Sequence, residues 1–334
     1  MTSTRVTIDD ASHVGRARRT AARLATQLGF DAAASNDVAI VATEAATNLV
    51  QHARHGEILL RPIVGEEAPG IELLALDRGP GVASVDDAMR DGYSTAGTRG
   101  AGLGAIQRLS TVFDMYSSPN SGTAVLSQMH ARAPRPSAAP PAIEVGAVCV
   151  ALPGEDSCGD DWALVTVAER AKVMVADGLG HGPVAAEAAA AAARAFRESA
   201  GTSLEAILRR AHAALHSTRG AALAIAELDP VAGTIRFAGV GNVAAAAVMA
   251  SGDRRSMISL NGIVGHEMRR VQEVTYPWPD DGLVLVHTDG LGTHWKLARY
   301  PGLHRKHPSL VAGILYRDHW RQRDDVTVVV ARRR

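Results

Sequence analysis

The sequence predicts an α/β protein built from two domains in succession. The chain has 334 residues, which is long for a single hydrophobic core and favours two domains. A proline-rich segment at residues 131–142 divides it. On both sides of this segment, apolar runs of strand length occur together with longer stretches of helical periodicity. Each part therefore combines strands with helices, and we expect sheets covered by helices.

The first part of the chain predicts an α/β sandwich with helices on one face of a sheet. Two helices come first, and two strands follow them. A glycine-rich loop then leads into a short helix and a last strand. The expected helices span residues 12–28, 36–54 and 104–109, and the expected strands span 57–64, 71–76 and 123–128.

The segment at residues 131–142 predicts a linker. Its four prolines, Pro134, Pro136, Pro140 and Pro141, lack backbone donors and favour extended polyproline geometry. We therefore expect a first domain at residues 1–130, a semi-rigid linker at 131–142 and a second domain at 143–334.

Strands outnumber helices after the linker. The expected strands span residues 143–152, 162–168, 172–176, 221–228, 234–238, 243–249, 283–287 and 326–331. The expected helices span residues 183–199, 203–216 and 308–320.

The composition excludes several classes of function. Lysine plus arginine and aspartate plus glutamate each number 35, so no nucleic-acid partner is expected. Two cysteines, Cys149 and Cys158, are too few for a disulfide scaffold and are typical of a reducing compartment. Residues 1–10 lack the apolar core of a signal peptide, and charges interrupt the alanine-rich stretch at 185–196. We expect a soluble cytoplasmic protein with no membrane partner.

A row of polar residues marks the second expected helix. Glu44, Asn48 and His52 recur every four positions and therefore share one face, beside the apolar arc that packs on the sheet. Such a row suits the wall of a pocket. It is also compatible with a helix that merely carries a few polar surface positions.

Further polar and glycine positions follow this helix in order. Asp77 ends an apolar strand, where its carboxylate can accept a hydrogen bond from an exocyclic amine, and Gly79 and Gly81 let a base lie against the backbone. A glycine loop then runs into a helix N-terminus, where exposed N–H groups suit phosphate. The glycines concerned are Gly100, Gly102 and Gly104, and Gly122-Thr123 completes the order.

This order of motifs resembles the Bergerat-type ATP-binding fold of gyrase, the ninety-kilodalton heat-shock chaperone and histidine kinases. Within that fold it resembles the small serine kinases and anti-sigma factors of bacterial stress switches. The segment at residues 88–95 looks like the RsbT-type kinase. The resemblance implies that the domain binds ATP with magnesium. It implies that Asn48 holds the magnesium, Glu44 polarises the attacking hydroxyl, Asp77 reads adenine with Thr123 beside it, and Gly100, Gly102 and Gly104 wrap the phosphates.

Four aspartates in the second part of the chain flank expected strands. These are Asp160, Asp177, Asp289 and Asp324. Hard divalent cations prefer oxygen ligands, and a two-metal site needs several converging carboxylates. Such a site generates a nucleophile from water near neutral pH. An Asp-Gly pair that merely ends a strand at a turn explains any one of them, but explains all four together less well.

Residues 143–334 resemble the metal-dependent serine/threonine phosphatases of the SpoIIE group and its RsbX-like branch. The matching segments are residues 177–182, 237–242, 261–266, 287–291 and 323–327. The resemblance implies an α-β-β-α sandwich with two manganese or magnesium ions. It implies that Asp160 and Asp177 bind both metals, that the Gly178 carbonyl assists, and that Asp289 and Asp324 complete one metal, with the adjacent Asp325 as the alternative. The arginine-rich early strand that steers phosphate in eukaryotic relatives has no clear counterpart.

Together the two resemblances imply a bifunctional regulator of a bacterial stress pathway. One domain would phosphorylate serine or threonine of STAS-domain switch proteins, and the other would remove such phosphates. A downstream phosphatase or a sigma factor is a further candidate partner. In the alternative, the first domain is an ATP-dependent binding module without kinase activity. A histidine kinase is disfavoured, because no helix pair with a phospho-acceptor histidine precedes the ATP-binding segment.

Overall fold

The computed structural model describes residues 1–63, 69–82, 102–131 and 141–334. Its contacts divide the chain into two compact units, Ser3–Ala139 and Pro140–Arg334, with Met1–Thr2 assigned to the second unit. The predicted α/β fold class is confirmed, because both units combine antiparallel sheets with helices. Gly100, the segment at residues 88–95 and most of the predicted linker lie outside the described residues.

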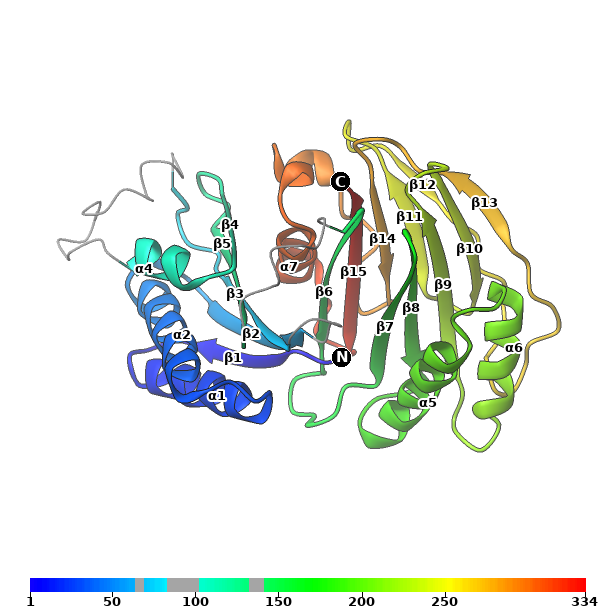
Figure 1. The fold of residues 1–334 in the computed structure, drawn as a ribbon, viewed down its shortest axis with the longest axis horizontal. Coiled ribbons are helices and arrows are strands. Elements are labelled where there is room, and N and C mark those ends of the chain that lie inside the picture. The colour runs from blue at the N-terminus through cyan, green and yellow to red at the C-terminus, as the bar shows by residue number, and fades with distance from the viewer. Residues whose placement is uncertain (64–68, 83–101, 132–140) are drawn as a thin grey trace. The chain divides into compact units, whose positions relative to one another are not determined.

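The N-terminal unit contains a five-stranded antiparallel sheet (Figure 1). Its central strand β3 is buried along its whole length, as the apolar run Ile71–Leu76 requires. The one acidic residue in this strand, Glu72, accepts a hydrogen bond at 2.8 Å from Arg61 of β2. In sheet order the strands are β1 (Thr4–Ile8), β2 (Gly56–Ile63), β3 (Gly70–Leu76), β5 (Thr123–His130) and β4 (Val112–Ser117).

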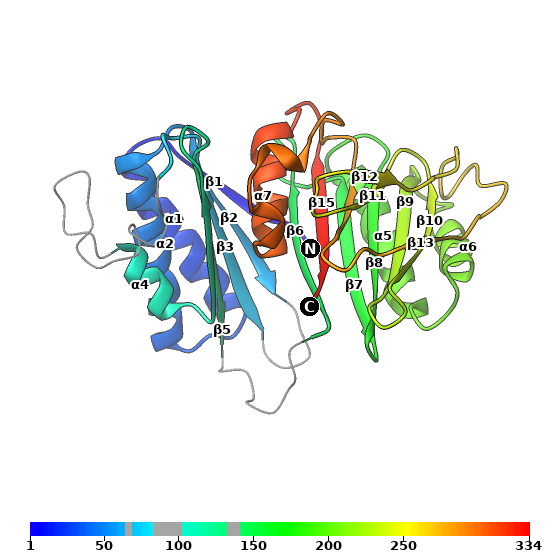
Figure 2. The ribbon, with the colours of Figure 1, turned by 90° about the horizontal axis from the view of Figure 1, so that it is seen from above.

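Three described helices cover one face of this sheet: α1 (Ser12–Gln27), α2 (Ala32–His52) and α4 (Gly102–Leu109) (Figure 2). Helix α2 begins four residues earlier than the sequence predicted. The reason is local, because the Asp31 side chain accepts a hydrogen bond from the Ala34 amide at 2.8 Å and caps the helix. The apolar side of α2 then packs in the core with the alanines of α1.

The C-terminal unit contains two five-stranded antiparallel sheets. The first has the order β13 (Val274–Pro277), β10 (Thr234–Val240), β9 (Ala221–Asp229), β8 (Arg170–Gly178) and β7 (Asp160–Val167). The second has the order β12 (Arg254–Ser256), β11 (Ala244–Val248), β14 (Leu283–His287), β15 (Val326–Arg333) and β6 (Ile143–Val150).

Helices complete the predicted α-β-β-α sandwich. Helices α5 (Pro183–Ser199) and α6 (Leu204–Ala214) pack on the first sheet, and α7 (Pro308–His319) packs on the second (Figure 1). One core lies between the two sheets, and another lies between the first sheet and its helices. Two short 3₁₀ helices, η1 (Leu297–Arg299) and η2 (Leu303–Arg305), precede α7.

Four strands are additional to those predicted: β1, β4, β12 and β13. Strands β1, β4, β12 and β13 all lie at sheet edges, where one side of the strand has no neighbour. Edge strands need no continuous apolar run, and β12 consists of three exposed residues, Arg254–Ser256. Hydrophobic patterning therefore could not reveal β12.

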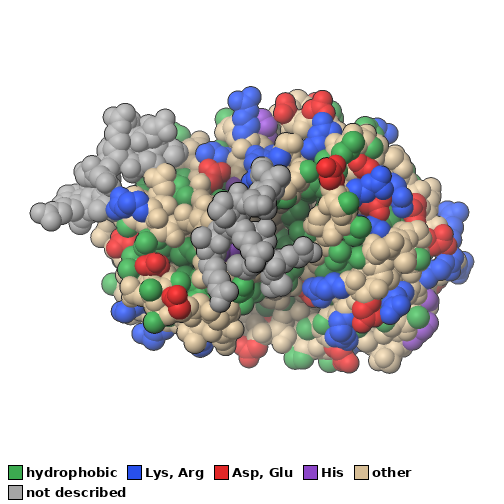
Figure 3. All heavy atoms as spheres, in the orientation of Figure 1, with side chains coloured by type: hydrophobic (Ala, Val, Ile, Leu, Met, Phe, Trp, Pro, Cys, Tyr) green, Lys and Arg blue, Asp and Glu red, His purple; other side chains and the backbone are tan. Residues whose placement is uncertain are grey.

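The surface agrees with the balanced composition. On the face shown in Figure 3, basic and acidic side chains are interspersed over the C-terminal unit and do not gather into one charged patch. Within the described residues, no helix combines the length and the apolar character needed to cross a membrane.

Candidate active sites

The first candidate site begins on α2. Glu44 and Asn48 are half-buried one helical turn apart, whereas His52 is exposed at the end of the helix. The first residue of α4, Gly102, lies against both. A Cβ atom on Gly102 would be 2.9 Å from Glu44 Oε2 and 3.2 Å from Asn48 Oδ1. The structure thus brings together Glu44, Asn48 and the beginning of the helix that follows the glycine loop. Gly104 is buried within that helix.

Asp77 and Thr123 lie next to each other at the end of adjacent strands. Asp77 is buried, its amide donates to the Thr123 carbonyl at 3.0 Å, and its Oδ1 accepts from the Gly79 amide at 2.5 Å. The Thr123 hydroxyl shares a hydrogen bond of 3.0 Å with Ser117 Oγ. Ser117 also accepts from the Val82 amide at 2.9 Å. Sequence reasoning gave Ser117 no role, because a lone serine at the end of a strand carries no signal.

Glycine is required where these two strands end. Gly122 has φ +72°, and a Cβ atom there would be 2.0 Å from the Asp77 carbonyl oxygen. Gly81 has φ +68°, and its Cβ would be 2.2 Å from the Ser118 carbonyl oxygen. At Gly122 and Gly81 the backbone therefore approaches the carbonyl oxygens of Asp77 and Ser118 more closely than a residue with a Cβ atom would permit.

The second candidate site lies at one end of the two-sheet sandwich. Asp160 begins β7 and is directly opposite Asp177, near the end of β8, in the antiparallel register. Asp289 follows β14, and Asp324 and Asp325 precede β15. Asp160 and Asp325 are buried, and the other three are half-buried.

Hydrogen bonds hold several of these carboxylates in place. Thr288 donates to Asp160 Oδ2 at 2.7 Å, which joins the second sheet to the first. Asn242 donates to Asp289 Oδ2 at 2.7 Å. Thr288 and Asn242 lie within two of the segments that carry the resemblance to the phosphatases, residues 287–291 and 237–242, but sequence reasoning gave neither residue a role. Thr288 directly precedes Asp289 in the sequence, which could have suggested a role for it, whereas Asn242 has no acidic neighbour there.

Asp324 and Asp325 differ in their surroundings. Asp325 accepts at both oxygens, from the Leu152 amide at 2.8 Å and from the Gly159 amide at 2.9 Å. Asp324 is half-buried, and one of its oxygens accepts from the next backbone amide at 2.9 Å. Of the two, Asp324 keeps more capacity to bind a cation, whereas Asp325 fixes the loop before Asp160.

Negative charge accumulates at this end of the sandwich. Burial, with the charges of Asp289, Asp324 and Asp325, raises the pKa of Asp177 to about 7. Burial and the neighbouring Asp177 raise the pKa of Asp160 well above its ordinary value. Burial and Asp289 raise the pKa of Asp324 as well. The mutual repulsion of neighbouring carboxylates disfavours their ionised form, and a cation bound between them stabilises that form.

The donor set fits hard divalent cations. Its ligands are carboxylate oxygens, and their mutual repulsion is what such ions relieve. Among the described residues, no three acidic, histidine or cysteine side chains have the spacing of a formed metal site. Ion binding therefore requires the aspartate side chains to turn toward one another. Gly178 lies at the same place, where a Cβ would be 2.2 Å from the Ala185 carbonyl oxygen and no larger residue fits.

Two further side chains lie beside the loop at residues 177–182. His181 Nδ1 shares a hydrogen bond of 2.7 Å with Glu155. Arg219 is exposed, and its Nη1 is 3.0 Å from the position of a Cβ on Gly180. Its neighbour Gly220 accepts a backbone hydrogen bond from Leu179 at 3.0 Å, which fixes the two loops together. Arg219 is thus an exposed cation beside the loop at residues 177–182, which sequence reasoning missed.

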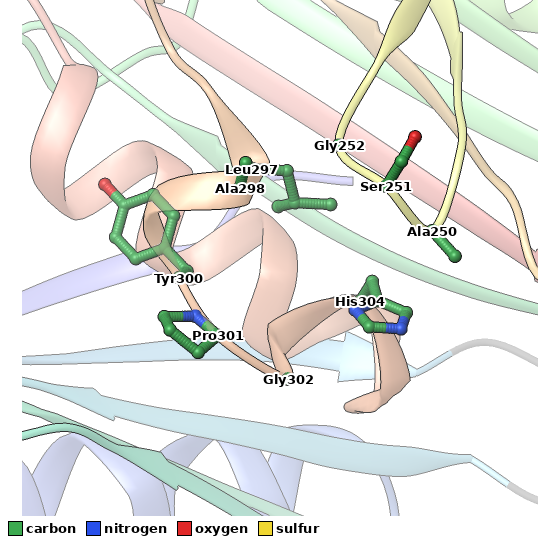
Figure 4. A pocket seen from close by; sticks show the side chains of 9 residues that line it. All are labelled: Ala250, Ser251, Gly252, Leu297, Ala298, Tyr300, Pro301, Gly302 and His304. Carbon is green, nitrogen blue, oxygen red and sulfur yellow. The ribbon is translucent and has the colours of Figure 1, made fainter.

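A separate pocket of about 180 Å³ lies elsewhere on this unit. Figure 4 shows Tyr300, Pro301 and His304 on one side and the turn Ala250–Gly252 on the other. None of the five aspartates is among its lining residues. It is therefore not part of the aspartate site.

The comparisons with known proteins treat the two parts of the chain separately. Residues 8–128 match the histidine kinase-like ATPase domain family. The serine/threonine-protein kinase RsbT of Bacillus subtilis (strain 168) is 31% identical over 109 residues, which cover 33% of this chain and 82% of RsbT.

Residues 168–334 match the family of stage II sporulation protein E (SpoIIE). The phosphoserine phosphatase RsbX of Bacillus subtilis (strain 168) is 27% identical over 138 residues, covering 41% of this chain and 69% of RsbX.

Two solved structures share the fold over 57% of the chain. One, from work on the bacterial stressosome as a modular system adapted to control secondary messenger signalling, is 31% identical over 99% of its own length, with a TM-score of 0.53. The other, RsbX in complex with magnesium, is 22% identical over 96% of its length, with a TM-score of 0.50.

The relatives are enzymes of two classes, a serine/threonine-protein kinase and a phosphoserine phosphatase, and this chain contains a domain related to each. Its second part carries the phosphatase domain of the SpoIIE type. The chain belongs to the SpoIIE family through residues 168–334 and carries a histidine kinase-like ATPase domain of the RsbT type at residues 8–128.

Proposed function

We propose that this chain is a bifunctional regulator of a bacterial partner-switching pathway. Residues 1–130 phosphorylate serine or threonine of a partner protein with ATP and magnesium. Residues 143–334 remove phosphate from such partners with two manganese or magnesium ions. The partners are STAS-domain switch proteins of the kind that the resemblance to RsbT and RsbX implies, and both reactions take place in the cytoplasm.

In the kinase reaction, the residues of the first site position the reactants. Asp77 accepts a hydrogen bond from the adenine amine, with Thr123 beside it. Asn48 holds the magnesium of ATP through its side-chain oxygen, and Gly102, with Gly100 and Gly104, places backbone N–H groups near the phosphates. Glu44 accepts the proton of the attacking hydroxyl. The contact of Gly102 with both Glu44 and Asn48 supports these roles, because phosphates bound at the beginning of α4 would lie next to Glu44.

In the phosphatase reaction, Asp160, Asp177, Asp289 and Asp324 hold two divalent ions, with the Gly178 carbonyl as a further ligand. When bound, these ions supply a nucleophile from water and neutralise phosphate charge. Thr288 and Asn242 orient Asp160 and Asp289. Asp325 holds both ends of the loop between Leu152 and Gly159 through its two hydrogen bonds with backbone amides.

Arg219 takes the phosphate-steering role for which the sequence showed no early arginine. Its exposed guanidinium lies beside Gly180, next to the loop that carries Asp177. A guanidinium forms paired hydrogen bonds with phosphate, and an exposed one can reach the phosphate of a folded protein.

The observation that carries this proposal is that both polar constellations are present within one chain. Glu44 and Asn48 face Gly102 in the N-terminal unit, and the aspartates surround Asp177 in the C-terminal unit. A binding module without kinase activity would need no catalytic carboxylate at position 44.

Two single variants of the full-length chain separate the reactions. Glu44→Gln removes the base while its side chain stays similar in size, and Asp289→Asn removes one metal ligand. Each variant is incubated with ATP, magnesium, manganese and the STAS proteins of the same operon. We expect Glu44→Gln to dephosphorylate but not phosphorylate, and Asp289→Asn to do the reverse.

The two results that would contradict the proposal point to different errors. If wild-type protein binds ATP without phosphorylating any STAS protein, the first domain is the binding module of the alternative. If the phosphatase reaction persists after EDTA treatment, the two-metal site is wrong.

A further inference from the structure

The two cysteines of the chain face each other in the C-terminal unit. Cys149 lies on β6 and Cys158 lies in the loop before β7, and their Sγ atoms are 3.7 Å apart. Cys149 is fully buried, and the exposed fraction of Cys158 is 7%. Both belong to the core between the two sheets. Since the chain contains only two cysteines, no other thiol in it can compete for pairing with either of them.

The pair is close enough to be oxidised. A disulfide needs an S–S distance of about 2.05 Å, so the sulfurs would approach each other by roughly 1.7 Å. Cys158 stands in a loop between two strands, whereas Cys149 is held in the ladder between β6 and β15. The loop residue is therefore the one that moves.

Movement of Cys158 is transmitted to the aspartate site. Gly159 follows directly, its amide donates to Asp325 Oδ2 at 2.9 Å, and its carbonyl accepts from the Gly178 amide at 3.0 Å. A Cβ on Gly159 would be 2.7 Å from Asp325 Oδ2 and 2.9 Å from Ala185 Cβ, so this segment has no room to shift independently. The next residue is Asp160.

A second contact leads to the same carboxylate. Cys149 Sγ lies 3.7 Å from the Asp160 carbonyl oxygen, in hydrogen-bonding position. Both sulfurs thus adjoin the backbone that sets Asp160 opposite Asp177. A bond between them changes the position of Asp160 through the chain and through this contact.

We propose that Cys149 and Cys158 form a reversible disulfide that weakens divalent-cation binding by Asp160 and Asp177. The oxidant is a small peroxide. One thiol sulfur attacks a peroxide oxygen, which breaks the O–O bond and gives a sulfenic acid and one water. The second sulfur displaces the hydroxyl group, which leaves as a second water, and the S–S bond forms. A dithiol reductant reverses the step by thiol–disulfide exchange.

The test uses full-length protein treated with hydrogen peroxide, and then with dithiothreitol. We expect free thiols under denaturing conditions to fall from two to none, and the intact mass to fall by two hydrogen atoms. Calorimetric titration with manganese should show binding weakened by about tenfold or more, the range seen when groups that support metal ligands are lost. Dithiothreitol should restore both thiols and the affinity.

Cys149→Ala and Cys158→Ala are the matched controls, because each leaves one thiol that cannot pair within the chain. Each should keep its manganese affinity through peroxide treatment. Recovery of wild-type protein in dithiothreitol tests the same point without a substitution, should either variant fold poorly.

Three results would overturn the proposal: thiols that persist or gain oxygen atoms without pairing, a disulfide that leaves manganese affinity unchanged, or equal loss of affinity in the alanine variants. The expected parallel loss of phosphatase activity rests on the proposed function. The manganese titration rests on its metal site, whereas the thiol counts rest on neither, so reduced protein that binds manganese but shows no turnover would contradict only the proposed phosphatase reaction.

Discussion

Asp77 is buried where β3 ends, and one of its oxygens already accepts a hydrogen bond from the Gly79 amide. Asp77→Asn replaces the charged acceptor by a neutral amide. Hydrogen bonds to charged groups contribute about 1.5–3 kcal/mol, so the Kd for ATP should rise roughly tenfold or more. Calorimetric titration of the full-length protein with ATP and magnesium measures this.

Asp9→Asn is the control for this substitution, because Asp9 is exposed and lies outside the candidate site. It should bind ATP as the wild type does. Equal affinity in Asp77→Asn and wild type would show that Asp77 does not read the base.

The raised pKa of Asp177 predicts how the stability of the metal-free C-terminal unit depends on pH. Its pKa of about 7 is far above that of an aspartate in an unfolded chain, so the folded state binds the proton more tightly. In EDTA, lowering the pH from about 7 toward 4 should therefore stabilise the C-terminal unit. Raising the pH through 7 removes this contribution. The effect is at most about 1.4 kcal/mol per pH unit, or a few degrees in Tm.

The matched variant is Asp177→Asn, which cannot ionise. Its Tm in EDTA should be higher than that of the wild type at pH 7.5, and should depend less on pH. Parallel pH profiles for the two proteins would contradict the role of Asp177 charge. Saturating manganese should stabilise the wild type and leave the variant largely unaffected, because the repelling carboxylate is also the proposed ligand.

Arg219 can be tested by its effect on substrate binding. Arg219→Ala should raise KM for a phosphorylated partner by about tenfold and change kcat less, because the guanidinium steers phosphate without replacing a metal ligand. Arg209→Ala on α6 is a suitable control, since Arg209 is exposed and pairs with Glu205. A purely catalytic defect, with kcat lowered and KM unchanged, would contradict the steering role.

At the residue scale, the order of motifs identified side chains that the fold brings together. It could not decide which of two adjacent residues of the same type belongs to the site. Asp324 and Asp325 are chemically identical, and they are distinguished by the deeper burial of Asp325 and by the two backbone amides that donate to it. Arg219 escaped notice because its proximity to Gly180 depends on a backbone hydrogen bond between separate loops. Contacts of this kind have no signature in spacing.

Helix α4 carries a prediction at the scale of an element. Gly102→Ala would favour the helix by propensity, but the added Cβ would lie 2.9 Å from Glu44 Oε2 and 3.2 Å from Asn48 Oδ1. Both side chains would have to move. We therefore expect phosphoryl transfer to fall by at least tenfold, while the Tm of the N-terminal unit stays within a few degrees of the wild type.

Gly15→Ala on α1 is the matched control. A Cβ there meets only the flexible end of Arg19, at 3.1 Å, so a glycine is removed from a helix without touching the site. This variant should retain kinase activity. If Gly102→Ala is as active as Gly15→Ala, then the contact of α4 with Glu44 and Asn48 has no part in catalysis.

Most elements followed from periodicity, and the exceptions have local causes. The predicted limits of α5 and β14 agree with the structure, because Pro183 starts the helix and a continuous apolar run defines the strand. The early start of α2 depends on the Asp31 cap. Residues 32–35 have no apolar spacing that would have predicted a helix there. Edge strands such as β12 form through pairing alone.

At the scale of the whole molecule, the two units have separate cores, one in the N-terminal unit and two in the C-terminal unit. The fold class was predictable because each half carries its own apolar runs and its own set of motifs. The assignment of Met1–Thr2 to the C-terminal unit was not predictable. It depends on the Met1 carbonyl, which accepts from Trp162 Nε1 at 2.9 Å, and such long-range pairing leaves no trace in local sequence.

We propose that the domains at residues 1–130 and 143–334 fold and act independently. Expressed alone, residues 1–130 should bind ATP with the affinity of the full chain. Residues 143–334 should keep their metal-dependent phosphatase activity, although they lack the hydrogen bond from Trp162 to Met1. They also lack the ion pair of the Met1 amino group with Asp161, and two partly exposed contacts of this kind contribute about 1 kcal/mol each, which a domain of this size tolerates.

Independent action would explain why the two domains share a chain. The proline-rich segment at residues 131–142 would keep the two domains at high local concentration around one partner, without a need for a common core. A mixture of the separate domains should then match the rates of the full chain on a soluble partner, but fall behind it on a partner held in a large assembly. If either domain is insoluble or inactive until the other is added, the two depend on each other for folding, and the domain limits proposed here are wrong.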